Sequence, residues 1–509
     1  MSLADRAIAR CVAAVFIAAI GVCSGSLAWA QSEGTPPAST DAASAGDAST
    51  ATTPADETWP DGYPADRWLP ETDLEGADPV LEDRRRAVPD YDGRPDRRTA
   101  GDVAIWIPRV VLYPVHLVTE YVLRRPLVGL VTWLEKHDVI AKAVNVVSFG
   151  TRGRVGLIPT AFVDFGVRPS VGLYLWANNV PTNNDRFALH FAWGGERWWR
   201  LSVRETVPFT SPLARDEDGD VRVHLLYDAR PDHLLWLPTD DGTTPASYFA
   251  RELGAGTELE LPFGTFDTID LSVDVANLTF ADGSTRGIER AETTVGDLAR
   301  VPDRDLGTLL AGFDGYTALR ADLDVSLDTR RPRPEPGSGA RVLLFGGGVQ
   351  ALDGSFTGAR WGGEGSVHLD VDGRHRVLSL RQRVEGMQQV GSGDIPIHEL
   401  PTLGGADAMR GFVSGRFRGP ATTVTSIQYT YPVWSMADGF VFYEVGGAFE
   451  DRFDDFELGR LAGSFGLGLR TINDRDAAFN VIVGAGTEAF DDGGRVEDLR
   501  LVFGVSRGF

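Results

Sequence analysis

Residues Leu400–Gly419 read LPTLGGADAMRGFVSGRFRG, and the remaining sequence is best understood outward from this stretch. Five glycines and one proline in twenty residues exclude a regular strand or helix, so the stretch is predicted to be a loop. Arg410 stands between Met409 and the Gly411-Phe412 pair, so the loop presents a positive charge that could pair with an acid elsewhere. Long loops in compact domains are uncommon unless they are functional or disordered, and this pattern is too specific for disorder. The loop is therefore predicted to be functional.

Alternating apolar and polar residues flank this loop, from His375 to Val384 and from Thr423 to Val433. A period of two is typical of β-strands whose two faces meet different surroundings. Sixteen strand-like segments follow one another from about Val146 to the last residue. They are predicted near 154–164, 171–178, 186–193, 198–206, 221–227, 247–261, 268–280, 316–328, 341–352, 364–371, 374–385, 423–433, 440–448, 462–471, 478–488 and 498–509.

The strands have one apolar and one polar face, and segment 316–328 shows this most clearly. Leu319, Leu323 and Leu327 share one face while charged residues occupy the other, as expected for a wall between lipid and water. A soluble β-sandwich would alternate too. However, the strands are longer than the usual five or six residues and approach the ~9–11 that cross a bilayer at a tilt. We therefore predict an all-β fold, a sixteen-stranded antiparallel transmembrane β-barrel with a short N-terminal helical segment.

The N-terminus has the features of a secretory signal. Arg6 and Arg10 precede an apolar run to Val22, and an Ala-x-Ala site ends at Ala30, so residues 1–30 are predicted to be a signal peptide. A lipoprotein signal at Cys23 is the alternative, although Val22 is a poor residue for the preceding position. Both cysteines of the sequence lie inside this segment, so no disulfide or thiolate metal site is expected after cleavage.

The segments between the signal and the barrel differ in composition. Residues 31–100 are rich in Ala, Ser, Thr, Pro and Asp and are predicted to be a disordered linker. Residues 101–145 carry apolar residues at helical spacing between Ile105 and Leu134, which predicts periplasmic amphipathic helices. These helices would pack at the barrel rim, or else anchor at the membrane surface or plug the lumen. No later apolar run is long enough for a membrane helix, so strands must make any crossing.

The final strand ends on an aromatic residue. Phe503, Val505 and Phe509 share its predicted outward face, and a terminal Phe on such a strand resembles the sorting signal of outer-membrane barrels. The formal charge of −23 argues against nucleic acid as a partner, because phosphate binding requires a basic surface.

Four patterns occur in the same order as in the BamA/TamA outer-membrane assembly family, also called the bacterial surface antigen family, which this chain resembles from about 146 to 509. The first is an Asp-x-Arg hairpin followed by a Pro-rich turn, and the second is the Arg-Gly-Phe loop. The third is Phe-x-Glu-x-Gly, where the family has Asp, and the fourth is Gly-x-Gly-x-Arg. The residues that match these motifs are Asp328, Arg330, Gly404, Gly405, Arg410, Gly411, Phe412, Phe442, Glu444, Gly446, Gly466, Gly468 and Arg470.

The resemblance implies that loop 387–420 folds back into the barrel, where the arginine of the loop meets an acid on the wall. Arg410, Gly411 and Phe412 are then expected to contact Glu444. The strand pattern agrees, because Tyr443 and the other odd-numbered residues form the better lipid face and leave Glu444 in the lumen. Arginine suits such a contact because its fork grips a carboxylate. The alternative is that both charges are merely solvated in a wet lumen.

The resemblance also implies a function, namely insertion or translocation of polypeptides through a lateral seam between the first and last strands. Pro159 in the first strand and Gly504 in the last are expected to weaken this closure. The implied partners are outer-membrane lipid, lipopolysaccharide and unfolded outer-membrane or secreted polypeptides. A passive pore or structural barrel remains the alternative, because the residues before the barrel lack the βααββ pattern of the family's POTRA modules.

The sequence gives little sign of enzymatic chemistry. The eight histidines show no pair at ligand spacing on one element, so no metal site is predicted. There is no Gly-x-Ser-x-Gly elbow, and Gly346-Gly347-Gly348 lies in a strand without the Lys-Ser/Thr of a phosphate loop. We therefore expect neither enzyme activity nor a cofactor. The expected location is the bacterial outer membrane, integral, with the N-terminal segment in the periplasm.

Overall fold

The structure is a computed structural model, and it describes most of the chain after residue 147. The described residues are 148–149, 155–164, 167–179, 184–214, 218–239, 242–264, 267–284, 311–331, 337–371, 373–391, 393–434, 437–450, 453–471 and 477–507. The predicted signal peptide, linker and helices, and the question of POTRA modules, lie outside these ranges. Among the described residues, no helix is long and apolar enough to cross a membrane.

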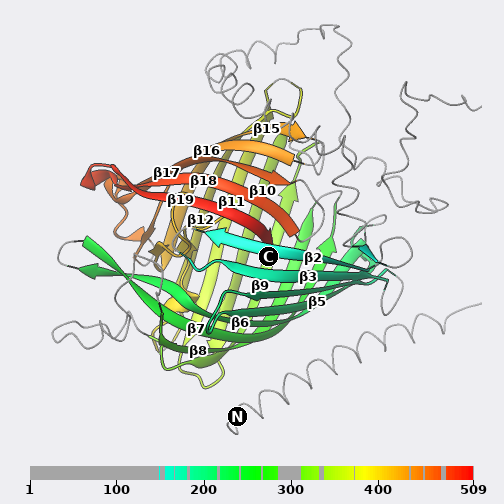
Figure 1. The fold of residues 1–509 in the computed structure, drawn as a ribbon, viewed down its shortest axis with the longest axis horizontal. Coiled ribbons are helices and arrows are strands. Elements are labelled where there is room, and N and C mark those ends of the chain that lie inside the picture. The colour runs from blue at the N-terminus through cyan, green and yellow to red at the C-terminus, as the bar shows by residue number, and fades with distance from the viewer. Residues whose placement is uncertain are drawn as a thin grey trace, which may run out of the picture. The chain divides into compact units, whose positions relative to one another are not determined.

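Sixteen long strands form one antiparallel sheet that closes on itself (Figure 1). Each strand pairs with the next along the chain, and the last pairs with the first. The strands are β2 (Val155–Asp164), β3 (Ser170–Asn178), β4 (Arg186–Trp193), β5 (Trp199–Thr210), β6 (Asp218–Thr239), β7 (Gly242–Pro262), β8 (Thr268–Asp282), β9 (Tyr316–Asp328), β10 (Gly339–Ala351), β11 (Thr357–Asp370), β12 (Val377–Gln389), β15 (Ala421–Trp434), β16 (Ala437–Phe449), β17 (Ala462–Thr471), β18 (Ala477–Ala489) and β19 (Val496–Arg507). The predicted sixteen-stranded barrel is confirmed.

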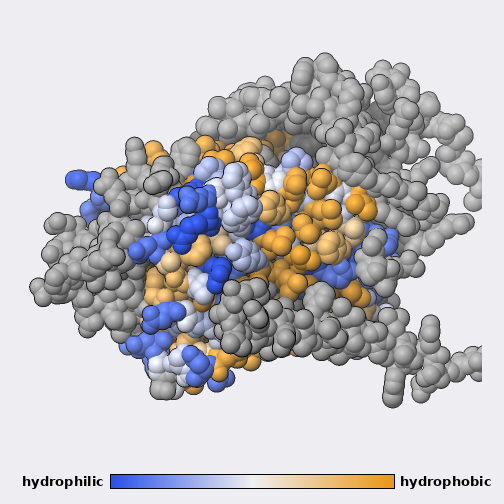
Figure 2. All heavy atoms as spheres, turned by 60° about the horizontal axis from the view of Figure 1, so that its bottom comes forward, coloured by the Kyte–Doolittle hydropathy of each residue, from blue (hydrophilic) through white to orange (hydrophobic). Residues whose placement is uncertain are grey.

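The strand faces follow the predicted alternation. On β9, Leu319, Leu323 and Leu327 are exposed on the outside, whereas Ala318 and Ser326 are buried on the inside. Figure 2 shows hydrophobic residues gathered over the middle of the face in view, with hydrophilic residues toward its margins. A large apolar surface is unfavourable in water, so this outer surface is suited to contact with lipid.

Several strands are longer than the sequence indicated. β6 and β7 have 22 and 21 residues, and their hairpin extends beyond the neighbouring strands (Figure 1). The register shifts between Arg230 and His233, a bulge that interrupts the alternation and therefore hid the second half of β6. β11 begins at Thr357 rather than near residue 364, because its glycines conceal the strand pattern.

The closure between β19 and β2 is short. Among the described residues it has three residue pairs, which join Phe162–Asp164 to residues 502–504. Every other pair of adjacent barrel strands has at least eight. The closure lies beyond Pro159, which has no N–H to donate to a ladder. The two-residue strand β1 (Ser148–Phe149) pairs with the start of β2 instead. We call this closure, formed by Phe162–Asp164 and residues 502–504, the seam.

Candidate functional site

The loop between β12 and β15 lies against the inner wall of the barrel. It contains a short 3-10 turn, η4 (Ile397–Glu399), and a two-residue pairing of β13 (Thr402–Leu403) with β14 (Phe417–Arg418). Gly404 and Gly405 have φ angles of +105° and +108°, in the left-handed region that favours glycine. A Cβ on Gly404 would also lie 2.1 Å from the carbonyl oxygen of Val413. The Gly-Gly pair therefore makes the sharp turn that presents the Arg410 segment to the wall.

Arg410 contacts Glu444 of β16 through both its backbone and its side chain. The Arg410 backbone N–H donates to Glu444 Oε2 at 2.7 Å, and Nε donates to Oε1 at 3.1 Å. Both residues are buried, with Glu444 0% exposed and Arg410 7% exposed. A buried carboxylate of this kind requires charged and hydrogen-bonding partners. The two charges are thus paired, and are not separately solvated as in the alternative considered from the sequence.

The surroundings of the pair supply further hydrogen bonds to both charged groups. Ser426 and Ser464 donate to Glu444 at 3.2 and 3.3 Å, and Arg410 Nη1 donates to Gln428 at 2.7 Å. The guanidinium of Arg410 lies 4.0 Å above the centre of the Phe442 ring, a cation–π geometry. Burial lowers the pKa of Arg410 to about 10, and the charge is still present at neutral pH.

Gly411 and Phe412 bring the loop directly onto the backbone of β18. The Gly411 N–H donates to Ser464 Oγ at 2.8 Å. A Cβ on Gly411 would lie 2.2 Å from the carbonyl oxygen of Ala485, and one on Gly486 would lie 2.5 Å from the Phe412 ring. Only glycine permits such close contact between loop and strand. This requirement explains the glycine after Arg410.

The other motif residues divide into two groups. Gly446, Gly466 and Gly468 line the wall near the loop, where a Cβ would lie within 2.6 Å of a carbonyl oxygen or a phenylalanine ring. Asp328 and Arg330 instead pair with each other at the turn between β9 and β10, with Arg330 Nε 2.9 Å from Asp328 Oδ1. This second pair is formed within the turn itself, so its geometry indicates a local role there.

Arg470 lies near Arg410 on the wall, because both guanidinium groups approach the Phe440 ring, that of Arg410 at 5.3 Å from the ring centre. The Arg470 guanidinium is 5.9 Å from the centre of the Phe440 ring. Phe503 is 43% exposed on the outer face of β19. The side chain of Val505 and all of Phe509 lie outside the described part of the structure. The proposed sorting signal therefore stays a prediction.

A second anchor of the loop was not predicted from the sequence. Glu399 of η4 accepts hydrogen bonds from Arg320 Nη2 at 2.6 Å and from the Tyr316 hydroxyl at 2.7 Å, both on β9. Burial by itself would raise the pKa of Glu399, but the Arg320 charge and the hydrogen bonds from Arg320 and Tyr316 together lower it. Arg320 also bonds to Glu252 of β7 at 2.8 Å. No local motif marks these residues, because the contact depends on where the loop crosses the lumen.

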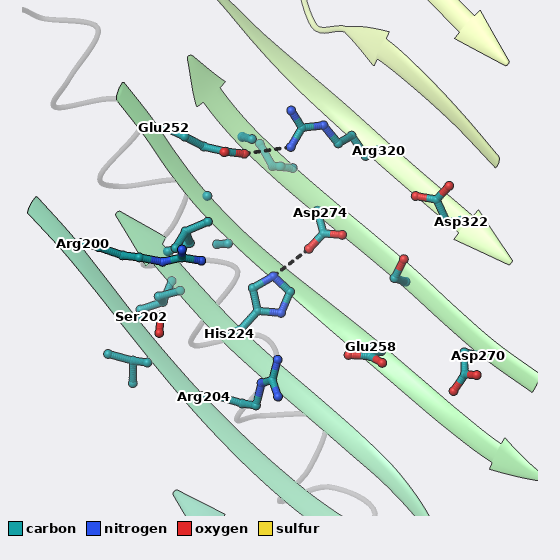
Figure 3. Close-up of a pocket in the computed structure, with 18 of the residues that line it drawn as sticks. Arg200, Ser202, Arg204, His224, Glu252, Glu258, Asp270, Asp274, Arg320 and Asp322 are labelled. Atoms are coloured by element: carbon teal, nitrogen blue, oxygen red, sulfur yellow. Dashed lines mark hydrogen bonds and ion pairs between the residues drawn. The ribbon is translucent and has the colours of Figure 1, made fainter. Parts of the chain in front are cut away.

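Beside this second anchor the wall of the lumen encloses a cavity of about 410 Å³ (Figure 3). Figure 3 shows arginines of β5 on one side and acidic residues of β7, β8 and β9 on the other. His224 lies 2.8 Å from Asp274 within it. Within the described ranges, no group of three or more His, Cys, Asp or Glu residues is arranged to hold a metal ion.

Comparison with known proteins places these features in a family. Residues 189–473, more than half of the chain, match the Omp85 superfamily domain. No curated protein matches the sequence. Among solved structures, BamA from Haemophilus ducreyi lacking POTRA domains 1-3 is 12% identical, with 69% of this chain and 70% of that chain covered and a TM-score of 0.48.

Two further solved structures are similar to this chain. CdiB from Acinetobacter baumannii is 11% identical over 69% of this chain and 59% of that chain, with a TM-score of 0.41. CdiB from Escherichia coli is 10% identical over 69% of this chain and 63% of that chain, with a TM-score of 0.42. The chain thus spans less than two thirds of the length of either CdiB.

Proposed function

Because this chain belongs to the Omp85 superfamily, we propose that it assists polypeptides in entering or crossing the outer membrane by opening its barrel at the seam. The chain is an integral β-barrel of the bacterial outer membrane. The observation that carries the proposal is the three-pair closure between β2 and β19. A strand edge left unpaired is a template for another strand, and a client polypeptide would supply one. The clients would be unfolded outer-membrane or secreted polypeptides.

The role proposed for the loop is to hold the barrel in its closed form. Arg410 and Glu444 fix the loop against β16, and the Gly411 N–H bonds to Ser464 of β17. Gly411 also packs on Ala485 of β18, which neighbours the seam strand β19. In a low-dielectric interior a paired and hydrogen-bonded charge is stable, whereas a separated one is not. Docking of the loop would therefore favour one arrangement of the last four strands.

A disulfide across the seam tests this mechanism. Val163 and Phe503 face each other in the register, and antiparallel neighbours lie within the distance that a disulfide spans. The Val163→Cys/Phe503→Cys protein should lose its effect on client assembly when oxidised and regain it on reduction. The matched control is Leu173→Cys/Phe191→Cys between β3 and β4, which should be insensitive to oxidation. Full client assembly with the seam locked would exclude seam opening.

A passive pore is the second candidate, and the charged cavity of Figure 3 favours it. Lumens lined by charged residues conduct ions when they are open. Planar-bilayer recordings of the parent protein distinguish the two candidates. Steady conductance, together with client assembly that is unchanged by depletion of the protein, would support the pore. Low conductance together with loss of specific outer-membrane proteins on depletion would support the assembly role.

A further inference from the structure

The inner face of β19 carries an arginine beside the seam. Arg500 is 4% exposed and lies between Asp498 and Val502 on the inward face, while Leu499 and Phe503 point outward. None of the sequence motifs includes it. A guanidinium has five N–H donors in a rigid fork and requires acceptors when it is buried. The acceptors of Arg500 come from two different parts of the molecule.

The first acceptor lies across the seam. Arg500 Nε donates to Asp164 Oδ1 at 2.7 Å, and Nη2 donates to Asp164 Oδ2 at 2.7 Å, which is the bidentate geometry. Asp164 is the last residue of β2 and is 4% exposed. The bond therefore links the first and last barrel strands at the point where their backbone pairing covers only three residues.

The second set of acceptors belongs to the loop. Arg500 Nη1 donates to the carbonyl oxygens of Gly405, of Arg410 at 3.2 Å and of Phe412 at 2.9 Å. These carbonyls stand on both sides of the segment that docks on Glu444. One guanidinium thus bonds to β2 and to the loop while its own backbone belongs to β19.

We propose that Arg500 is a latch that couples docking of the loop to closure of the seam. If the loop leaves, Nη1 loses its acceptors in a buried place, and the geometry that holds the other two nitrogens on Asp164 is no longer fixed. If the seam opens, Asp164 and Arg500 each lose a charged partner, and the orientation that serves the loop is lost. Undocking of the loop and opening of the seam both break bonds of Arg500, so each event favours the other. This inference deepens the proposed function, because it names what links the loop to the seam.

Hydrogen–deuterium exchange of the full-length protein in lipid nanodiscs tests the latch without any client. Glu444→Gln weakens docking of the loop at β16, three strands away from β19. With Arg500 present, this change should raise exchange in the seam peptides of β2 and β19 by about fivefold or more, within the usual range of allosteric coupling. In an Arg500→Gln background, seam exchange should already be raised, and Glu444→Gln should add less than about twofold.

Coupling is reciprocal, so a change on the seam side should be detected in the loop. Asp164→Asn removes the charge opposite Arg500 and touches no loop residue, yet it should raise exchange across residues 403–412. The matched control is Glu385→Gln, which breaks another arginine–glutamate pair on the lumen wall, 3.0 Å from Arg360, and should alter neither region.

Two outcomes would overturn the latch. One is a Glu444→Gln protein whose loop exchanges faster while the seam is unchanged. The other is the same increase in seam exchange with and without Arg500. If Arg500→Gln fails to fold, Arg500→Lys serves in its place, since one ammonium cannot grip Asp164 bidentately while serving the loop carbonyls. Failure of the latch would leave the disulfide test of seam opening unaffected, and absence of client activity would leave the exchange result intact.

Discussion

Replacing Arg410 by alanine should release the loop while the barrel stays folded. The change removes the contact of Nε with Glu444 at 3.1 Å, the bond of Nη1 to Gln428 and the stacking on Phe442. A hydrogen bond to a charged group contributes about 1.5–3 kcal/mol, and a desolvated cation–π contact about 2 kcal/mol. The strands themselves lose no backbone hydrogen bond, so the effect should be confined to the loop.

Some of the support for Glu444 remains in the Arg410→Ala protein. The backbone N–H of residue 410 still points at the carboxylate, Ser426 and Ser464 still donate to it, and Arg381 lies 3.9 Å away. We therefore expect a loss of about 3–5 kcal/mol in the free energy of loop docking, the usual cost of removing one member of a buried pair. At about 1.4 kcal/mol per factor of ten, this corresponds to a shift of two to almost four orders of magnitude in the docking equilibrium.

Limited trypsin digestion measures this shift. Arg416 and Arg418 in the loop should become cleavable in Arg410→Ala, while the barrel keeps its heat-modifiable migration in detergent gels. Arg460→Ala is the matched control, because its partner Asp455 lies on the loop between β16 and β17 and such exposed pairs contribute at most about 1 kcal/mol. A loop as resistant to trypsin as that of the parent, or a barrel that unfolds, would refute the reasoning.

Three further changes probe the same loop. Gly411→Ala should undock it, because the new Cβ would lie 2.2 Å from the Ala485 carbonyl oxygen, and trypsin sensitivity close to that of the parent would contradict this contact. Glu444→Asp should weaken docking by about 1–3 kcal/mol, since a shorter acid cannot meet both the backbone N–H and Nε of residue 410; tighter docking, measured by hydrogen exchange, would be inconsistent with the geometry. Burial and the nearby Arg418 charge lower the pKa of His398 to about 4, so protons bind the undocked loop more readily, and docking should weaken as pH falls from about 6.5 to 4. In His398→Gln this pH dependence should become weaker, and exchange rates that remain equally pH-dependent would implicate another group, such as His233, whose ring lies 5.9 Å from that of His398.

The sequence alone was sufficient to predict the barrel and to predict that Glu444, the wall residue of the loop contact, points into the lumen. Period-two alternation and strand length are local properties, and they predicted all sixteen strands. Alternation within Phe442–Gly446 also directed Glu444 into the lumen, where the structure has it. Where alternation failed, at the bulge after Arg230, the extent of β6 was underestimated. The signal peptide, the linker and the helices stay predictions.

Only the closed barrel determines which distant residues meet. Arg500 and Asp164 are 336 positions apart, and they become partners because the register of the seam brings the last strand to the end of the first. Glu399 and Arg320 meet because the loop crosses the lumen to reach the inner face of β9. Alternation tells which face a side chain occupies, but the stagger between strands sets its height along the wall. A local pattern can therefore predict that a charge points inward, whereas its partner is determined by the tertiary structure.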